Sequence, residues 1–138
     1  MNKWKKALAL VTVGASLMAC QGPVSKIQAQ VHHYTPKQTC PTLKDLKVGE
    51  VLVFTAPENP STGYQWQLLQ PLKLFKIEES YLAEESDDPV PVVGMGGEKS
   101  FRFTAVKPGQ ALIELAYVRP WESNKQSEIQ WHCRIRVS

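Results

Sequence analysis

The sequence predicts an all-β fold built as a two-sheet β-sandwich. Short stretches alternate apolar and polar residues, which is typical of strands buried on one face. Turn-forming Gly, Pro and Asn residues separate these stretches, and after the N-terminal segment no long stretch has the period of a helix. About six to eight short strands in about 100 residues favour a single domain with one core.

The first half of the predicted sandwich contains three strand segments. An apolar, β-branched run at 50–55 follows a turn at 47–49, and a second strand covers 64–69. Trp66 on the second strand is expected to be the core tryptophan of the sandwich. A mixed stretch at 75–82 is expected to form one or two further strands.

The second half alternates more regularly. At 100–105 aromatic and polar residues take turns, so Phe101 and Phe103 are expected inside. A tight hairpin turn at 107–110 contains Pro and Gly and leads into a strand at 111–117 with one apolar face. The last strand is expected to direct five residues inward: Ile129, Trp131, Cys133, Ile135 and Val137.

The N-terminal segment has the composition of a targeting signal. A basic start precedes an apolar run at 7–17, which is shorter than the about 20 residues that a transmembrane helix needs. Residues 1–19 are therefore predicted to be a cleaved secretory signal peptide. Leu17-Met18-Ala19-Cys20 resembles a bacterial lipobox, which would make Cys20 the lipidated first residue of the mature chain. The alternative is an ordinary signal peptide cleaved near Ala19 or slightly later.

The lipobox interpretation places the protein in the cell envelope, anchored to a membrane through the lipid on Cys20. Gln21 after this cysteine resembles lipoproteins sorted to the outer membrane of Gram-negative bacteria. Residues 20–39 show little apolar periodicity and are predicted to be a flexible tether to a domain at 40–138. The tether contains His32-His33, for which a polar linker is favoured over a metal site because no third ligand is near in sequence.

The charge of the expected mature chain is balanced. The full chain holds 16 Lys and Arg against 13 Asp and Glu, and residues 1–19 contain three lysines and no acid. A neutral mature chain offers no argument for nucleic-acid binding. It also lacks a paired His–carboxylate motif, a metal-ligand spacing and a phosphate loop. No enzyme activity, metal or cofactor is therefore predicted.

Two cysteines remain after the predicted cleavage, Cys40 and Cys133. In a chain bound for an oxidising compartment, one disulfide between them is the simplest expectation. A catalytic Cys133 is the alternative. It is disfavoured because Cys133 belongs to the inward-facing set, while the adjacent His132 points to the opposite face of the strand.

Three short loops carry the functional signal, and the first is Asn59-Pro60-Ser61-Thr62-Gly63-Tyr64. Pro60 fixes its own φ, and Asn59 can cap the turn with its side-chain amide. Gly63 permits a positive φ where the chain turns back into a strand. The small hydroxyls of Ser61 and Thr62 are then expected at the tip, with an aromatic residue at the base.

The second loop is Gly94-Met95-Gly96-Gly97, whose glycines permit close approach of the backbone to a partner. The third loop, Arg119-Pro120-Trp121, presents a large aromatic residue of the kind that anchors interfaces. Arg119 either takes part in the contact or braces the loop through backbone carbonyls. Because loops between alternate strands cluster at one end of a sandwich, the three loops are expected to meet there.

In this order and spacing, the three loops resemble the binding loops of the chagasin family, the immunoglobulin-like inhibitors of papain-type cysteine proteases. The resemblance covers about residues 42–138, and Ser61 and Thr62 both match the family pattern at the tip of the first loop. It implies an immunoglobulin-like β-sandwich that acts as a monomer and as a reversible, tight-binding inhibitor. All three loops would block the active-site cleft of a papain-like cysteine protease. A non-inhibitory immunoglobulin-like envelope or adhesion lipoprotein is the alternative, since a fold alone does not fix a function.

Overall fold

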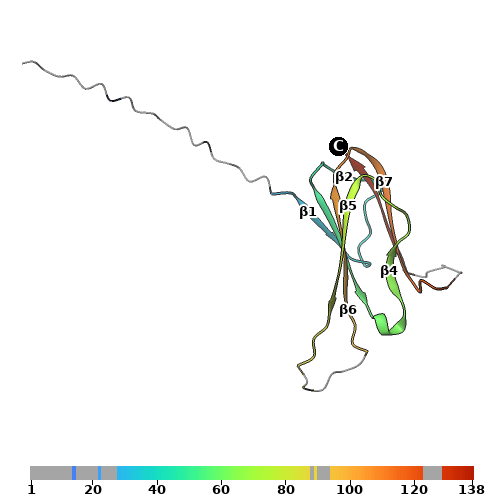
Figure 1. Cartoon of the computed structure of the whole chain (residues 1–138). Helices are drawn as coiled ribbons and strands as arrows, with labels where there is room; N and C mark the ends of the chain where they lie inside the picture. Colours follow the sequence, from blue (N-terminus) through green and yellow to red (C-terminus); the bar gives the residue numbers. More distant parts are fainter. Residues whose placement is uncertain (1–13, 15–21, 23–27, 88, 90–93, 123–128) are drawn as a thin grey trace, which may run out of the picture.

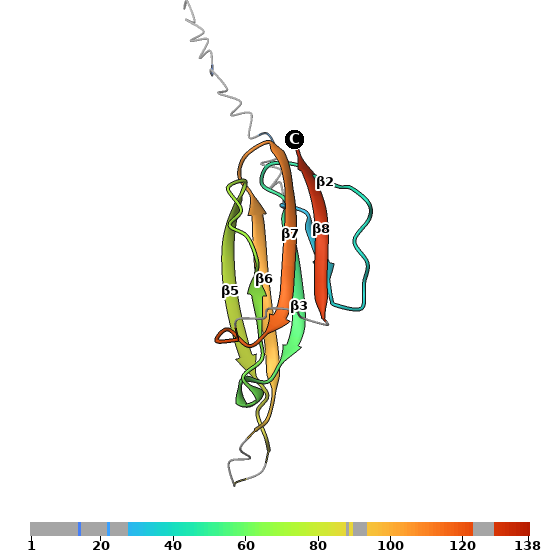
Figure 2. The ribbon, with the colours of Figure 1, turned by 90° about the vertical axis from the view of Figure 1, so that its right-hand side faces the viewer.

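In the computed structural model, which describes residues 14, 22, 28–87, 89, 94–122 and 129–138, two four-stranded sheets pack face to face (Figures 1 and 2). The first sheet has the strand order β1-β3-β6-β5 and the second has the order β2-β8-β7-β4. The strands are β1 Val31–Tyr34, β2 Lys44–Leu46, β3 Val51–Glu58, β4 Gln65–Leu68, β5 Phe75–Ala83, β6 Gly97–Ala105, β7 Gly109–Val118 and β8 Gln130–Val137. The predicted all-β sandwich is confirmed. Within the described ranges, no helix has the length and apolar character to cross a membrane.

Aromatic residues from both sheets fill the space between the layers. Phe54 of β3 and Phe101 and Phe103 of β6 are fully buried, and Trp66 of β4 is 4% exposed. The rings of Phe54 and Trp66 meet edge to face with centroids 5.1 Å apart. Such pairs add to the large apolar area that each ring buries, so they hold the two sheets together. The predicted inward positions of Trp66, Phe101 and Phe103 are confirmed.

The last strand alternates as expected, with one exception at its start. Trp131, Cys133, Ile135 and Val137 are buried, whereas Ile129 is 49% exposed. Ile129 precedes the first residue of β8, so it lies at an end of the sandwich where the opposite sheet does not cover it. There it lines a pocket of about 620 Å³, together with other side chains that include Pro57 and Trp66. The inward prediction for Ile129 is therefore wrong.

The segment expected to be a flexible tether through residue 39 is partly built into the fold. Val31–Tyr34 form β1, which pairs in parallel with β3 so that Val31 lies opposite Val51. The Tyr34 ring packs 5.5 Å from the Trp131 ring, and the Trp131 indole N–H donates to the backbone carbonyl of Gln38 at 2.9 Å. Backbone pairing with a strand of the core fixes this segment, and such pairing leaves no apolar period in the sequence. Cys20 lies outside the described residues.

A disulfide joins Cys40 to Cys133, with the two Cα atoms 5.3 Å apart. It ties the segment after β1 of the first sheet to β8 of the second sheet. The two residues are separated by 93 positions, and closing a loop of that length contributes about 4–5 kcal/mol in the chain-entropy model. The predicted disulfide is confirmed.

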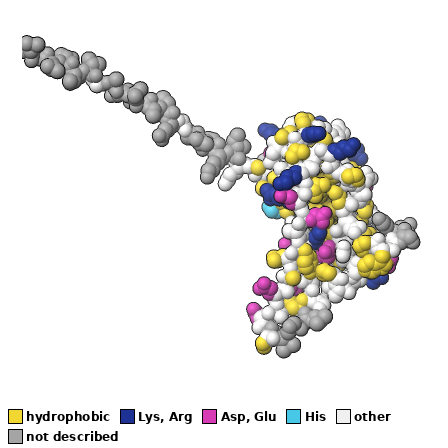
Figure 3. All heavy atoms as spheres, viewed as in Figure 1, with side chains coloured by type: hydrophobic (Ala, Val, Ile, Leu, Met, Phe, Trp, Pro, Cys, Tyr) yellow, Lys and Arg dark blue, Asp and Glu magenta, His cyan; other side chains and the backbone are white. Residues whose placement is uncertain are grey.

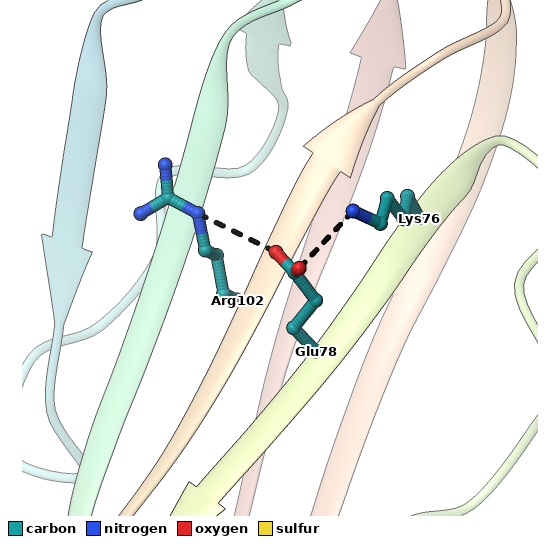
Figure 4. Close-up of polar contacts among 3 residues, drawn as sticks. All are labelled: Lys76, Glu78 and Arg102. Atoms are coloured by element: carbon teal, nitrogen blue, oxygen red, sulfur yellow. Dashed lines mark hydrogen bonds and ion pairs between the residues drawn. The ribbon is translucent and has the colours of Figure 1, made fainter.

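Ion pairs lie on the exposed face of the first sheet. Glu78 on β5 lies between Lys76, at 3.1 Å, and Arg102 on β6, at 3.8 Å (Figure 4). Pairs this exposed are worth about 0–1 kcal/mol each, so they tune the surface rather than hold the fold. At the other sheet, the hydrogen bond and charge of Asp45 raise the pKa of Arg136 above its usual value.

Candidate functional site

Loop 1 (residues 59–64) crosses from β3 of the first sheet to β4 of the second, and its tip is a short 3-10 turn, η1 (Pro60–Thr62). Asn59 has an extended backbone with φ −123° and ψ 99°. Its side-chain oxygen accepts hydrogen bonds from the Ser61 N–H at 3.1 Å and from the Ser61 hydroxyl at 2.6 Å. Gly63 ends the turn at φ 79°, a left-handed conformation that favours glycine. The structure thus confirms the predicted Asn59 cap and the positive φ at Gly63.

The two exposed hydroxyls of the tip are engaged within loop 1. The Thr62 hydroxyl donates to the backbone carbonyl of Asn59 at 2.7 Å and accepts from the Tyr64 N–H at 3.3 Å. Because the Ser61 hydroxyl also donates to Asn59, both hydroxyl protons are already used inside the loop. A tip that is ordered before it meets a partner loses less conformational freedom on binding.

Loop 2 (residues 94–97) lies beside loop 1. The Asn59 side-chain amide donates to the backbone carbonyl of Gly94 at 2.9 Å, so one asparagine organises both loops. At Gly96, an added Cβ would lie 3.4 Å from the backbone oxygen of Glu58, which shows how closely the two segments approach. Met95 between these glycines is half-buried.

Gly97 differs from the other predicted contact residues because it is buried in the first position of β6. An added Cβ would collide with the backbone oxygen of Leu82 and would lie 2.5 Å from the Tyr81 hydroxyl. Glycine here makes room for Tyr81 on the neighbouring strand β5. Gly97 therefore supports loop 2 from within the fold and is not exposed to a partner.

Loop 3 (residues 119–121) follows β7 and rests on loop 1. Trp121 is 69% exposed, and its ring lies so close to Gly63 that a Cβ on Gly63 would collide with it. The Arg119 guanidinium stacks 4.4 Å from the centroid of the Tyr64 ring, and its Nη1 lies 3.2 Å from the Glu122 carboxylate. Among the described residues, Arg119 braces the loop through the Tyr64 ring and the Glu122 carboxylate, and no contact with a backbone carbonyl is seen there.

A continuous aromatic stack connects the core to loops 1 and 3. The Trp66 and Tyr117 ring centroids are 5.4 Å apart, and those of Tyr117 and Tyr64 are also 5.4 Å apart. Arg119 then covers Tyr64 on the outside. Sequence reasoning did not assign Tyr117 to the site, although its position on the apolar face of the 111–117 strand was the available signal.

The three loops form one connected surface at one end of the sandwich. Loop 1 touches loop 2 through Asn59 and Gly94, and it touches loop 3 through Gly63 and Trp121. Figure 1 shows η1 at the lower end of the domain, on the same side as the end of β5 and the start of β6 and opposite the C-terminus. The space-filling view shows a hydrophobic patch at the right of that lower half (Figure 3). The predicted clustering of the loops is confirmed.

The two histidines expected in a polar linker lie on strand β1 instead, so that expectation is wrong. His32 Nε2 lies 3.6 Å from the Glu50 carboxylate. Among the described residues, no group of three or more His, Cys, Asp or Glu side chains could hold a metal ion.

Residues 45–135 match the model of a family described as the chagasin family peptidase inhibitor I42. The chain belongs to the chagasin family. Members of this family are inhibitors rather than enzymes, and the family indicates a cysteine protease inhibitor.

Named relatives agree with this assignment. Amoebiasin-2 of Entamoeba histolytica is 30% identical over 98 residues, covering 71% of this chain and 78% of that protein. Chagasin of Trypanosoma cruzi is 31% identical over 80 residues, covering 54% of this chain and 69% of that protein. A solved cysteine protease inhibitor from Entamoeba histolytica shares the fold with a TM-score of 0.67 at 24% identity, covering 80% of this chain and 98% of that one. A solved structure described as Leishmania mexicana ICP gives a TM-score of 0.59 at 25% identity, covering 74% of this chain and 91% of that one.

Proposed function

We propose that this chain is a reversible, tight-binding inhibitor of papain-like cysteine proteases that blocks the active-site cleft with loops 1, 2 and 3. The observation that supports this best is the mutual contact of the loops. The Asn59 side chain is hydrogen-bonded to loop 2, and the Trp121 ring of loop 3 packs against Gly63. Together they form a preformed wedge at one end of a rigid sandwich, and preformed surfaces bind with a smaller entropic loss.

In the proposed mechanism, the shape of loop 1 prevents cleavage, and no reaction with the protease is needed. A papain-like protease cleaves when its thiolate reaches a carbonyl carbon in an aligned attack geometry. Loop 1 would enter beside the nucleophile with its backbone held in a 3-10 turn by Asn59, Thr62 and Gly63. The tip would present small hydroxyl oxygens there instead of an aligned carbonyl. Loop 2 would lie along one wall of the cleft, and Trp121 would anchor the other side.

Titration of the whole chain against papain tests this proposal. A nanomolar dissociation constant, about −12 kcal/mol, is ordinary for an interface of standard size. We expect inhibition that is reversed on dilution, with both proteins recovered intact. If several papain-like proteases keep full activity at micromolar concentrations of the chain, the proposal is wrong and the non-inhibitory envelope or adhesion role is favoured.

We also propose that residues 1–19 are a signal peptide and that Cys20 carries a lipid that anchors the monomeric inhibitor in the cell envelope, at the outer membrane. These residues lie outside the described ranges apart from Gly14, so the support comes from the sequence: the basic start, the short apolar run, the lipobox pattern and Gln21. Palmitate labelling should appear in the wild-type chain and disappear in Cys20→Ser. An unlabelled wild-type chain would reduce the signal to simple secretion.

A further inference from the structure

Glu58 is a buried carboxylate that the three-loop description does not use. It is 7% exposed and is the one buried polar or charged residue within the described ranges. It ends β3, immediately before loop 1. No ion pair in the described part of the chain involves it. Burying a carboxylate is costly unless hydrogen bonds satisfy it, so the position of Glu58 calls for a reason.

Glu58 fastens one end of loop 1 to the other. Its Oε2 accepts a hydrogen bond from the Trp66 backbone N–H at 2.6 Å. In return, the Trp66 indole N–H donates to the backbone carbonyl of Pro57 at 3.1 Å. These two bonds join the residues just before loop 1 to a residue just after it, and we call the pair of bonds the clasp.

The clasp also bridges the two sheets. β3 belongs to the first sheet, whereas β4 is an edge strand of the second sheet that pairs with β7. An edge strand has backbone N–H groups on its free side without a strand partner, and Glu58 supplies the partner for Trp66. A hydrogen bond to an ionised carboxylate is shorter and stronger than a neutral one. The clasp therefore holds the two ends of loop 1 together independently of the hydrogen bonds at its tip.

Resting on the proposed function, we propose that Glu58 is the positioning residue that keeps loop 1 an inhibitor rather than a substrate. A loop in a protease cleft is cleaved when the thiolate attacks a carbonyl carbon and the C–N bond breaks, so that the amine leaves with a proton from the catalytic histidine and a thioester remains. Water then hydrolyses the C–S bond of the thioester, which releases the new carboxylate and restores the thiolate. A misplacement of about 1 Å changes the rate of such a step by about a hundredfold. The clasp prevents the backbone of loop 1 from relaxing into the attack geometry.

The test compares Glu58→Leu, Glu58→Asp and Glu58→Gln with Glu98→Leu in the whole chain. Leu removes the acceptor and keeps the bulk, Asp shortens the reach to Trp66, and Gln retains an oxygen that can accept the same bond. Glu98 is a matched control because it is exposed and lies opposite Pro57 in the sheet register, without a bond to loop 1. Each variant is titrated against papain, and protease activity and inhibitor mass are followed over time.

We expect Glu58→Leu and Glu58→Asp to inhibit at least about tenfold more weakly and to be cut within residues 59–65, with papain activity returning as cutting proceeds. Glu58→Gln should stay within about threefold of wild type and remain intact, as should Glu98→Leu. Thermal unfolding of each variant separates loop effects from loss of the fold, and Glu58→Asp decides the matter if Glu58→Leu does not fold.

Wild-type inhibition and an uncut loop in folded Glu58→Asp and Glu58→Leu would overturn the inference. Cutting outside residues 59–65 would overturn it as well, because the clasp protects that loop only. If the wild-type chain itself does not inhibit, all variants fail alike. That pattern identifies failure of the proposed function, and this inference falls with it.

Discussion

Trp66 and Trp121 belong to the same end of the molecule, but they have opposite environments. Trp66 is 4% exposed and packs against Phe54 and Tyr117, whereas Trp121 is 69% exposed and rests on the backbone of Gly63. The Trp66 indole is part of the core, whereas the Trp121 indole lies on the surface. The comparison teaches that the residue that stabilises the fold is separate from the residue that we propose as the binding anchor, although Trp66 on β4 and Trp121 in loop 3 both lie close to loop 1.

The largest effect should come from Trp66→Ala, which empties part of the core and removes the indole bond to Pro57. Core Trp→Ala substitutions cost about 3–5 kcal/mol of unfolding free energy. Chemical denaturation monitored by circular dichroism measures the loss. A Trp66→Ala domain that unfolds at the wild-type midpoint but inhibits poorly would show that the two tryptophans have been assigned the wrong way round.

Trp121→Ala should weaken protease binding by about 2–4 kcal/mol, mostly through faster dissociation, because it removes an exposed aromatic anchor. The melting temperature should hardly change, since the ring is mostly in solvent. Surface plasmon resonance against immobilised papain gives the dissociation rate. Val48→Ala is the control, because Val48 is 49% exposed and lies before β3, away from the loops. Equal losses for the two variants would contradict a specific anchor.

Gly63→Ala should have the smallest effect of the three, about 1–3 kcal/mol on binding. An alanine there is strained at φ 79° and pushes against the Trp121 ring. Inhibition constants of the single and double variants with Trp121→Ala form a double-mutant cycle. If Gly63 acts by seating Trp121, its effect should shrink in the Trp121→Ala background. Strict additivity would mean that the two residues act separately.

Alternation along the strands was sufficient to predict most of the fold. Phe101 and Phe103 on β6 and Cys133 on β8 are buried as their period of two requires. The Asn59 cap and the positive φ of Gly63 could also be predicted from the sequence, because cap formation and positive φ are local properties. These features depend on neighbours in the chain, and a single sequence records them directly.

Features that depend on distant neighbours were not predictable in the same way. The stretch that forms β1 is ordered by pairing with Val51 and the residues after it. The composition of this stretch does not predict that pairing. Ile129 continues the inward period of β8 beyond the point where the opposite sheet covers it. Glu58 is buried because an edge strand offers it the Trp66 N–H, and a carboxylate before a turn gives no hint of that partner.

The parallel pairing of β1 with β3 also sets the end of the sandwich at which the N-terminal segment enters. The chain joins the sandwich at Val31, opposite the first residue of β3, and the loops begin at the other end of that strand. β3 is 8 residues long, which corresponds to about 26 Å. A bead or a fusion partner joined before Val31 is therefore attached at the end of β3 that lies away from loop 1. The N-terminus is the natural handle for displaying this inhibitor on a surface.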